Sequence, residues 1–148
     1  MTGTGFDIGL DDPQQSGIFF VTADDIATLG MAARDAGLDV ARIDLRGCAD
    51  KATLLLRMAH ALEAPAGQGR NWDALADQLR DLSWRDAPDG KPGHVLLFDD
   101  TQDLRDADEA SFDTLLEILE DTAEDWSAQE LPFWAFLALP EHEFEPVN

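Results

Sequence analysis

The sequence predicts an α/β domain in which helices cover a mainly parallel sheet of three to four strands. Short apolar runs of strand length alternate along the chain with segments that have helical spacing, and these runs are nearly continuous, as in strands buried on both faces. The 148 residues, 45% of them hydrophobic, suffice to build one core. Strands that alternate with helices are typical of a parallel sheet joined by right-handed crossovers.

The first predicted strand and helix follow an N-terminal segment with few large apolar residues. Residues 1–16 are rich in Gly, Asp and Gln, and we expect a flexible tail there, followed by a single domain over residues 17–148. The run IFFVT has the character of a buried strand. Thr22 with Asp25 three positions on is an acidic variant of a capping box that opens a helix, and Gly37 can end that helix.

The remaining elements continue the alternation. Pro65 closes one helix, and the turn-rich loop PDGKPG precedes the apolar strand HVLLF. We expect a strand at 39–45, a helix at 50–63, a helix within 69–82, a strand at 94–98, a long amphipathic helix from about 108 to 126 and a last strand at 133–139.

The helix within residues 69–82 carries an aspartate at every fourth position. At about 100° per residue, Asp73, Asp77 and Asp81 lie within roughly 80° of arc, and we call these three residues the aspartate ladder. Each like-charged pair one turn apart destabilises an isolated helix by a few tenths of a kcal/mol. Asn71 is a suitable N-cap, so the helix dipole stabilises the charge of Asp73 but not the other two. The opposite face is apolar: Trp72, Leu75, Leu79 and Leu82.

Two interpretations of the aspartate ladder stay open on its own evidence. It can be a solvated face in an acid-rich protein, where such spacing arises by chance. It can also be a docking face for arginine and lysine, because short carboxylate side chains lose little rotamer entropy when they enter a cationic pocket built for phosphate. The small residues Ala74 and Ala76, with Gly67 and Gly69 in the preceding loop, would let the backbone of a partner come close.

Composition narrows the class of partner. With 10 basic and 31 acidic residues the net charge is −21, so the chain repels nucleic acid and anionic lipid and attracts basic proteins. A single cysteine, Cys48, allows no internal disulfide, and the N-terminus lacks the basic and apolar regions of a signal peptide. The longest apolar run is too short to span a bilayer. We expect a cytoplasmic monomer whose partner is a basic protein.

The same helix resembles the barstar family of ribonuclease inhibitors. The segment P-x-x-x-G-x-N-x-D-A-L-x-D-x-L of that family is matched here by Pro65, Gly69, Asn71, Asp73, Ala74, Leu75, Asp77 and Leu79. The order of elements over residues 39–140 is also similar, and the first strand and helix would be an addition to the barstar-like sheet. The resemblance implies an intracellular inhibitor in which Asp77 enters the active site of a basic ribonuclease where substrate phosphate would sit. It implies that Asp73 assists and that Asp121, near the end of the long helix, is a further interface acid.

Some positions depart from the barstar pattern. Barstar has aromatic residues where this chain has Gly67, Gln68 and Ala76, and an acid where it has Arg70. Because aromatic residues supply much of the energy of protein interfaces, these departures imply weaker binding to barnase itself, or another basic nuclease as the target.

Two other functions compete with inhibition. An Mg²⁺-dependent phosphoryl-transfer enzyme could use Asp99 and Asp100, with Asp103, at the carboxyl end of a parallel strand, although the D-x-D-x-T spacing of phosphatases is not met there. The chain has neither the G-x-G-x-x-G nor the G-x-x-x-x-G-K-[ST] motif of nucleotide-binding proteins. His60, His94 and His142 lack the spacing of metal ligands. We therefore expect no catalytic residue, cofactor or metal. The remaining alternative is an acidic interaction module for a different basic partner.

Overall fold

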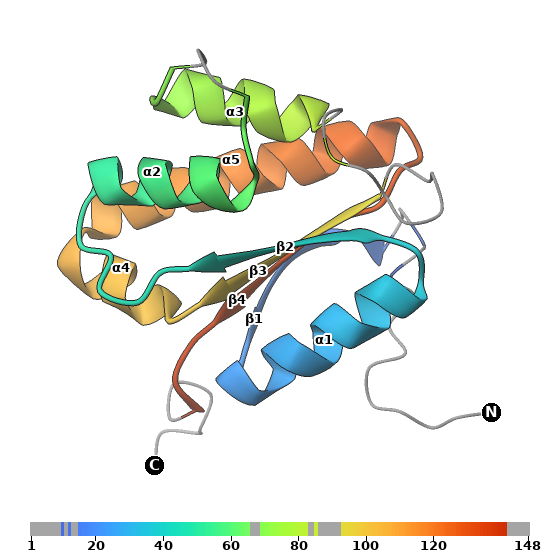
Figure 1. The fold of residues 1–148 in the computed structure, drawn as a ribbon, viewed down its shortest axis with the longest axis horizontal. Helices are drawn as coiled ribbons and strands as arrows, with labels where there is room; N and C mark the ends of the chain where they lie inside the picture. Colours follow the sequence, from blue (N-terminus) through green and yellow to red (C-terminus); the bar gives the residue numbers. More distant parts are fainter. Residues whose placement is uncertain are drawn as a thin grey trace.

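A computed structural model describes residues 10, 12, 15–65, 69–82, 85 and 93–141. Its sheet has four strands: β1 (Gly17–Val21), β2 (Asp39–Asp44), β3 (His94–Asp99) and β4 (Phe133–Ala138). All neighbouring strands are parallel, and their order is β1-β4-β3-β2 (Figure 1). The predicted α/β class with a parallel sheet is confirmed.

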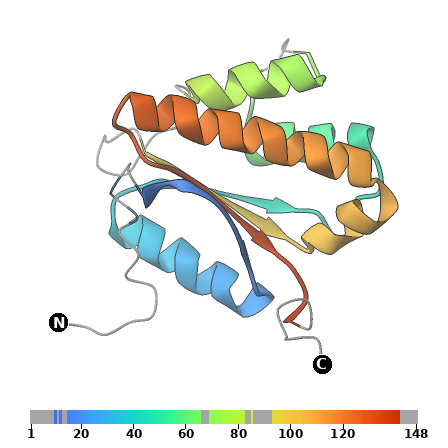
Figure 2. The same cartoon turned by 180° about the vertical axis from the view of Figure 1, so that it is seen from behind.

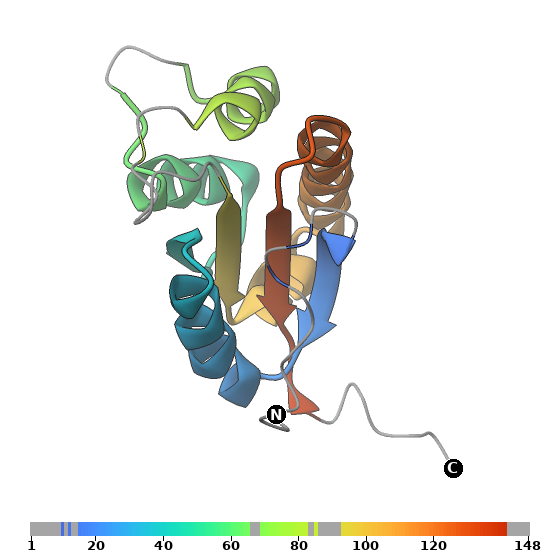
Figure 3. The ribbon, with the colours of Figure 1, turned by 90° about the vertical axis from the view of Figure 1, so that its right-hand side faces the viewer.

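Helices cover both faces of this sheet (Figures 1 and 2). Helix α1 (Ala23–Asp35) lies on one face. Helices α2 (Lys51–Ala61) and α5 (Glu109–Ala128) lie on the other, and α3 (Trp72–Asp81) forms an outer layer that contacts both of them. The short helix α4 (Thr101–Ala107) follows β3 directly. Strands β1 and β2 form the two edges of the sheet, and Figure 3 shows β1 at its edge beside β4. Among the described residues, no helix is both long and apolar enough to cross a membrane.

The sheet divides the apolar core into two parts, because alternate residues of each strand point to opposite faces. On the α1 side, Leu97 and Phe136 pack with Ile26 and other buried residues of α1. On the side of α2, α3 and α5, Phe98 and Leu137 belong to a larger cluster of buried side chains. This larger cluster fixes the helices that carry the candidate site.

The first strand and helix enlarge the barstar-like part by one strand and one covering helix. Strand β1 pairs with β4, and the amide and hydroxyl groups of Thr22 donate to the Asp25 carboxylate at 3.3 and 3.1 Å, so the predicted capping residues do interact. Gly37 adopts φ +81° just after α1, as a helix-ending glycine does. Of the predicted tail, residues 1–9, 11, 13 and 14 lie outside the described residues. Leu10 is buried, and its carbonyl accepts from the Trp134 indole at 2.9 Å.

Helix α4 was absent from the sequence prediction, which assigned its residues to a loop between β3 and the long helix. Its seven residues are too few to show a periodic apolar face, and only Leu104 and Thr101 are buried. The helix begins directly after Asp100, which has the left-handed φ of +53°, and ends at Asp108, whose carboxylate caps α5 by accepting from the Ser111 amide at 3.1 Å.

A buried ionic cluster closes the amino end of β2 and β3. The Arg85 guanidinium donates to the Asp39 carboxylate at 2.6 and 3.3 Å, and His94 Nδ1 lies 3.0 Å from the same carboxylate. Arg85 also donates to the carbonyls of Ala61 and Val40. Burial raises the pKa of Asp39, but hydrogen bonds from His94 and Arg85 and their charges outweigh it, so the net pKa is lowered. The cluster joins Arg85, which follows α3 in the sequence, to the first residues of β2 and β3.

We expect Asp39→Asn to lower the free energy of unfolding by about 3 kcal/mol at neutral pH, because the Arg85 charge would stay buried without its carboxylate. Since folding lowers the pKa of Asp39, the stabilisation is complete above the ordinary value of 3.8 and is lost as the pH falls through the folded-state value. The difference in free energy of unfolding between wild type and variant, measured by urea titration, should therefore become smaller below pH 3.8. A gap that stays constant with pH would contradict this account.

Candidate partner-binding site on helix α3

Helix α3 has well-defined ends. The Asn71 side chain accepts from the Ala74 amide at 2.7 Å, which confirms the predicted N-cap. At the other end Leu82 adopts a left-handed φ of +50° while its side chain is buried. Gly69 is exposed, and a Cβ added there would lie 3.3 Å from the Asn71 side-chain nitrogen. A larger residue at this position would therefore press on the capping side chain.

The apolar face of α3 is fixed to α5. Leu75 and Leu79 are buried, and the Trp126 indole of α5 donates to the Leu79 carbonyl at 2.9 Å within the core. Near the surface, the Arg80 guanidinium lies 2.9 Å from the Asp125 carboxylate. These contacts hold the last turns of α3 against its neighbour.

The first turn of α3 is fixed to α2 instead. Trp72 is half-buried against the larger core cluster, and the Lys51 ammonium of α2 lies 5.4 Å from the centre of its ring. A cation over an indole face stabilises such a pair by about 0.5–1 kcal/mol at an exposed site. The predicted docking of α3 by its tryptophan and leucines is thus what the structure shows.

The aspartate ladder points away from the protein. Asp73, Asp77 and Asp81 are all exposed, and the Asp77 side chain is 81% exposed. Among the described residues, Asp77 has one ion-pair contact, with Arg80, whose Nη1 is 4.0 Å away, at the limit of an ion pair, while its Nε is bound to Asp125. The ladder is therefore accessible to a visiting molecule. Ala74 and Ala76 lie between these aspartates in the sequence and are half-buried. Their small side chains project little from the helix.

Asp121 is exposed on α5. It lies one helical turn before Asp125, which reaches Arg80 of α3. Its place in an interface with a partner stays a prediction. Gly67 and Gln68, where barstar has aromatic residues, lie outside the described residues. Arg70 is exposed immediately before the cap.

Two of the three acids considered for a metal-dependent enzyme, Asp99 and Asp103, already have protein partners. Asp99 receives two hydrogen bonds from the Arg42 guanidinium, at 2.6 and 3.0 Å, and Asp103 accepts from the Gly47 amide at 2.7 Å. Over the described part of the chain, no group of three or more His, Cys, Asp or Glu side chains is arranged to hold a metal ion. His94 is engaged with Asp39, His60 is exposed on α2, and His142 lies outside the described residues.

Sequence reasoning missed the contacts that orient α3. The pairing of Arg80 with Asp125 and of the Trp126 indole with Leu79 joins residues 45 or more positions apart, and helical periodicity places each residue on a face without naming its partner. The spacing of Trp126 from Leu119 and Ala123 was the available signal that this tryptophan belongs to the buried stripe of α5.

Comparison with known proteins identifies the family. No curated protein matches the chain. Among solved structures, a chain of the Drosophila ORC bound to DNA superimposes with a TM-score of 0.50 at 18% identity, over 88% of this chain and 34% of that one. At that identity the likeness concerns the fold alone, and this chain spans about a third of the other's length. The family model described as Barstar (barnase inhibitor) matches residues 38–138. Because that match spans more than half of the chain, the protein belongs to the barstar family.

Proposed function

We propose that this protein is a non-catalytic inhibitor of a basic ribonuclease, and that α3 blocks the phosphate-binding part of the nuclease active site. The observation that carries the proposal is the exposure of the aspartate ladder on a helix whose other face is fixed in the core. Membership of a family described as barnase inhibitors supports it. In this proposal Asp77 is the central contact, because it is the middle member of the ladder and its side chain is 81% exposed.

The ladder suits a cationic cleft for a physical reason. Successive members are four residues apart, so they rise about 6 Å along the helix axis, and they start from a backbone that is already ordered. Ordering them on binding therefore costs little entropy, and each carboxylate can accept the paired hydrogen bonds that arginine offers to phosphate. Asp73 flanks the central contact on the side of the cap, Asp81 flanks it on the other, and Asp121 adds negative charge from α5.

The residues around the ladder set how close the partner comes. Half-buried Ala74 and Ala76 and exposed Gly69 present little bulk, while Asn71 holds the first turn. Because Ala76 replaces an aromatic residue of barstar, charge and backbone contacts must supply a larger share of the binding energy here than in barstar. The proposed target is therefore a basic nuclease whose surface differs from that of barnase, or barnase bound more weakly.

The proposed setting is the cytoplasm of the producing cell, where a monomer with a net charge of −21 would capture the nuclease before it meets cellular RNA. The nuclease is basic for the same reason that it binds RNA, so opposite charge steers the two proteins together. The engagement of Asp99 with Arg42 and of Asp103 with Gly47 argues against the metal-dependent enzyme.

Asp77→Ala should weaken binding by about 2–4 kcal/mol, or about 30- to 1000-fold, because it removes the central carboxylate from a cationic site. Asp113→Ala removes an equally charged and exposed residue from α5, away from the ladder, and should change affinity less than about threefold. Calorimetry against the nuclease that co-purifies from the native cell, with barnase as a reference, measures both. Circular dichroism verifies that both variants are folded.

Equal losses of affinity in the two variants would mean that α3 contributes only to the overall negative charge. A bound protein without ribonuclease activity would favour the alternative, an acidic interaction module for a different basic partner.

Raising the salt concentration from about 0.05 to about 0.5 M should slow association with the nuclease at least about tenfold, because exposed charges steer the encounter and salt screens them. Dissociation should change less, since it depends on the close contacts that form after the encounter. Stopped-flow fluorescence separates the two rate constants. An association rate that is independent of salt would rule out steering by this surface.

A further inference from the structure

Strand β1 leaves two phenylalanines half exposed at an edge of the sheet. Phe19 is 43% and Phe20 is 42% exposed, although both make ring contacts with the core. Phe19 contacts the rings of Trp134 (tilted) and Phe136 (stacked) on the α1 side, with ring centres 5.6 and 5.9 Å apart, and the ring of Phe20 lies 6.4 Å from that of Phe112 on the α5 side. Each ring is therefore covered in part from β4 or α5, and the rest of it is left open to solvent.

The composition of β1 does not oppose the addition of a further strand. Its five residues, GIFFV, include no charged residue and no proline, which are two of the features by which natural edge strands prevent pairing. Among the residues that the structure describes, β1 pairs only with β4, so it is an edge strand of this sheet. A strand of this composition at an edge is a template for the addition of a further strand.

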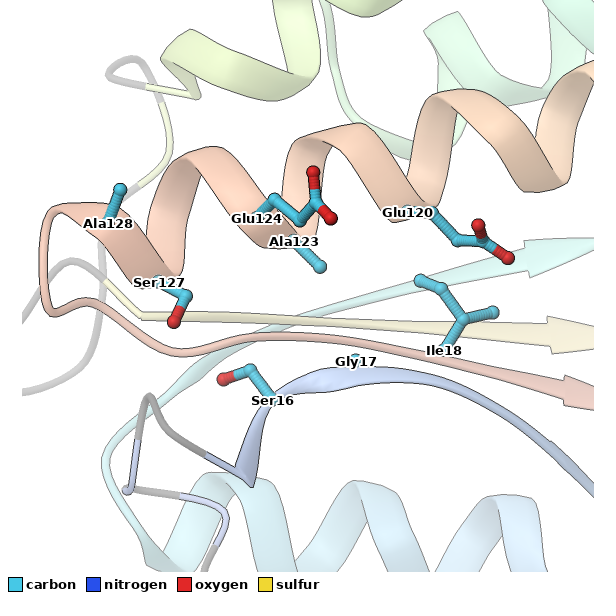
Figure 4. A pocket seen from close by; sticks show the side chains of 8 residues that line it. All are labelled: Ser16, Gly17, Ile18, Glu120, Ala123, Glu124, Ser127 and Ala128. Carbon is cyan, nitrogen blue, oxygen red and sulfur yellow. The ribbon is translucent and has the colours of Figure 1, made fainter.

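A groove runs beside this edge, between β1 and α5 (Figure 4). Ala123 and Ser127 point from α5 toward β1, and Glu120 extends toward Ile18. The groove is lined by Ser16, Gly17, Ile18, Glu120, Ala123, Glu124, Ser127 and Ala128. Its floor is formed by small side chains, and its charged groups are the two glutamates, which are both exposed.

We propose that the β1 edge and this groove bind an extended, cationic segment of a partner protein by strand addition. Backbone groups of the segment pair with β1, and its alternate side chains face opposite sides of the sheet. Its apolar side chains cover Phe19 on the α1 side, and its lysine or arginine side chains reach Glu120 and Glu124 on the α5 side. The negative charge of the two groove glutamates favours a cationic occupant. Two copies paired through β1 would bring four glutamates together in molecules that each carry a charge of −21, so a second copy fits poorly.

This surface is separate from the ladder. Helix α3 contacts α5 on the side of Asp125, whereas the groove lies along the side of Glu120 and Glu124, and α3 and β1 are separated by the helix layer (Figure 3). The inference therefore does not rest on the proposed inhibitory function, and both partners could be bound at once.

The test measures binding of a fluorescent peptide of alternating valine and lysine to the full chain by anisotropy. A version with N-methylated backbone groups along one edge, which cannot pair with β1, should lose at least about tenfold in affinity, as should a valine–glutamate version. On the protein, the pair Glu120→Gln and Glu124→Gln should weaken binding about tenfold. The double substitution Asp73→Asn and Asp81→Asn removes the same charge from α3 and should change the affinity for the peptide less than about twofold.

A second comparison tests the apolar contact. Phe19→Ala should weaken peptide binding at least about fivefold, because the valines of the peptide face the α1 side. Leu56→Ala truncates a side chain of α2 that is 47% exposed and should leave peptide binding unchanged. Circular dichroism verifies folding of each variant. Equal effects of the two charge pairs, full binding of the N-methylated peptide, or no effect of Phe19→Ala would each overturn the proposal. So would a dimer in sedimentation velocity that Phe19→Ala dissociates, because the occupant would then be a second copy.

Discussion

The attachment of α3 to α5 is the constraint on which the candidate site depends. A helix with three aspartates on one face gains nothing from that face in isolation, so its free energy must come from the opposite one. Buried Leu75 and Leu79 supply apolar contact, and the Trp126 indole donates to a backbone carbonyl of α3 within the core. That bond also fixes the rotation of α3 about its axis, and rotation decides whether the carboxylates face a partner or the protein itself.

Several of the few cations of this chain fix its structure. Arg42 binds Asp99, Arg85 binds Asp39 and Arg80 binds Asp125, so three of ten basic residues neutralise acids at sheet ends or between helices. The carboxylates of the ladder have no comparable partner among the described residues, apart from the contact of Asp77 with Arg80 at the limiting distance of 4.0 Å. The distribution of charge thus separates acids that stabilise the fold from acids that are open to solvent, and net charge alone could not make that distinction.

The sequence predicted features that depend on local pattern and missed those that depend on distant partners. Apolar periodicity placed the strands and the larger helices, and Asn71 marked the start of α3, because capping and side-chain alternation act within a few residues. Strand order was not predictable in this way, since β1 pairs with β4 more than a hundred residues later. Arg85 lies between segments outside the described residues, and nothing in its neighbours indicated that it would reach Asp39.

The added strand β1 changes what the barstar-like part of the sheet can do. The family match begins at residue 38, so β1 and α1 precede it, and in their absence β4 would be the edge strand. Every residue of β4 is buried. Addition of β1 moves the edge to a strand with two half-exposed phenylalanines and sets it beside glutamates of α5. Because α5 contacts α3 through Asp125 and lines the groove beside β1 with Glu124, a single helix borders both acidic surfaces, and their charges would attract cationic partners from two sides.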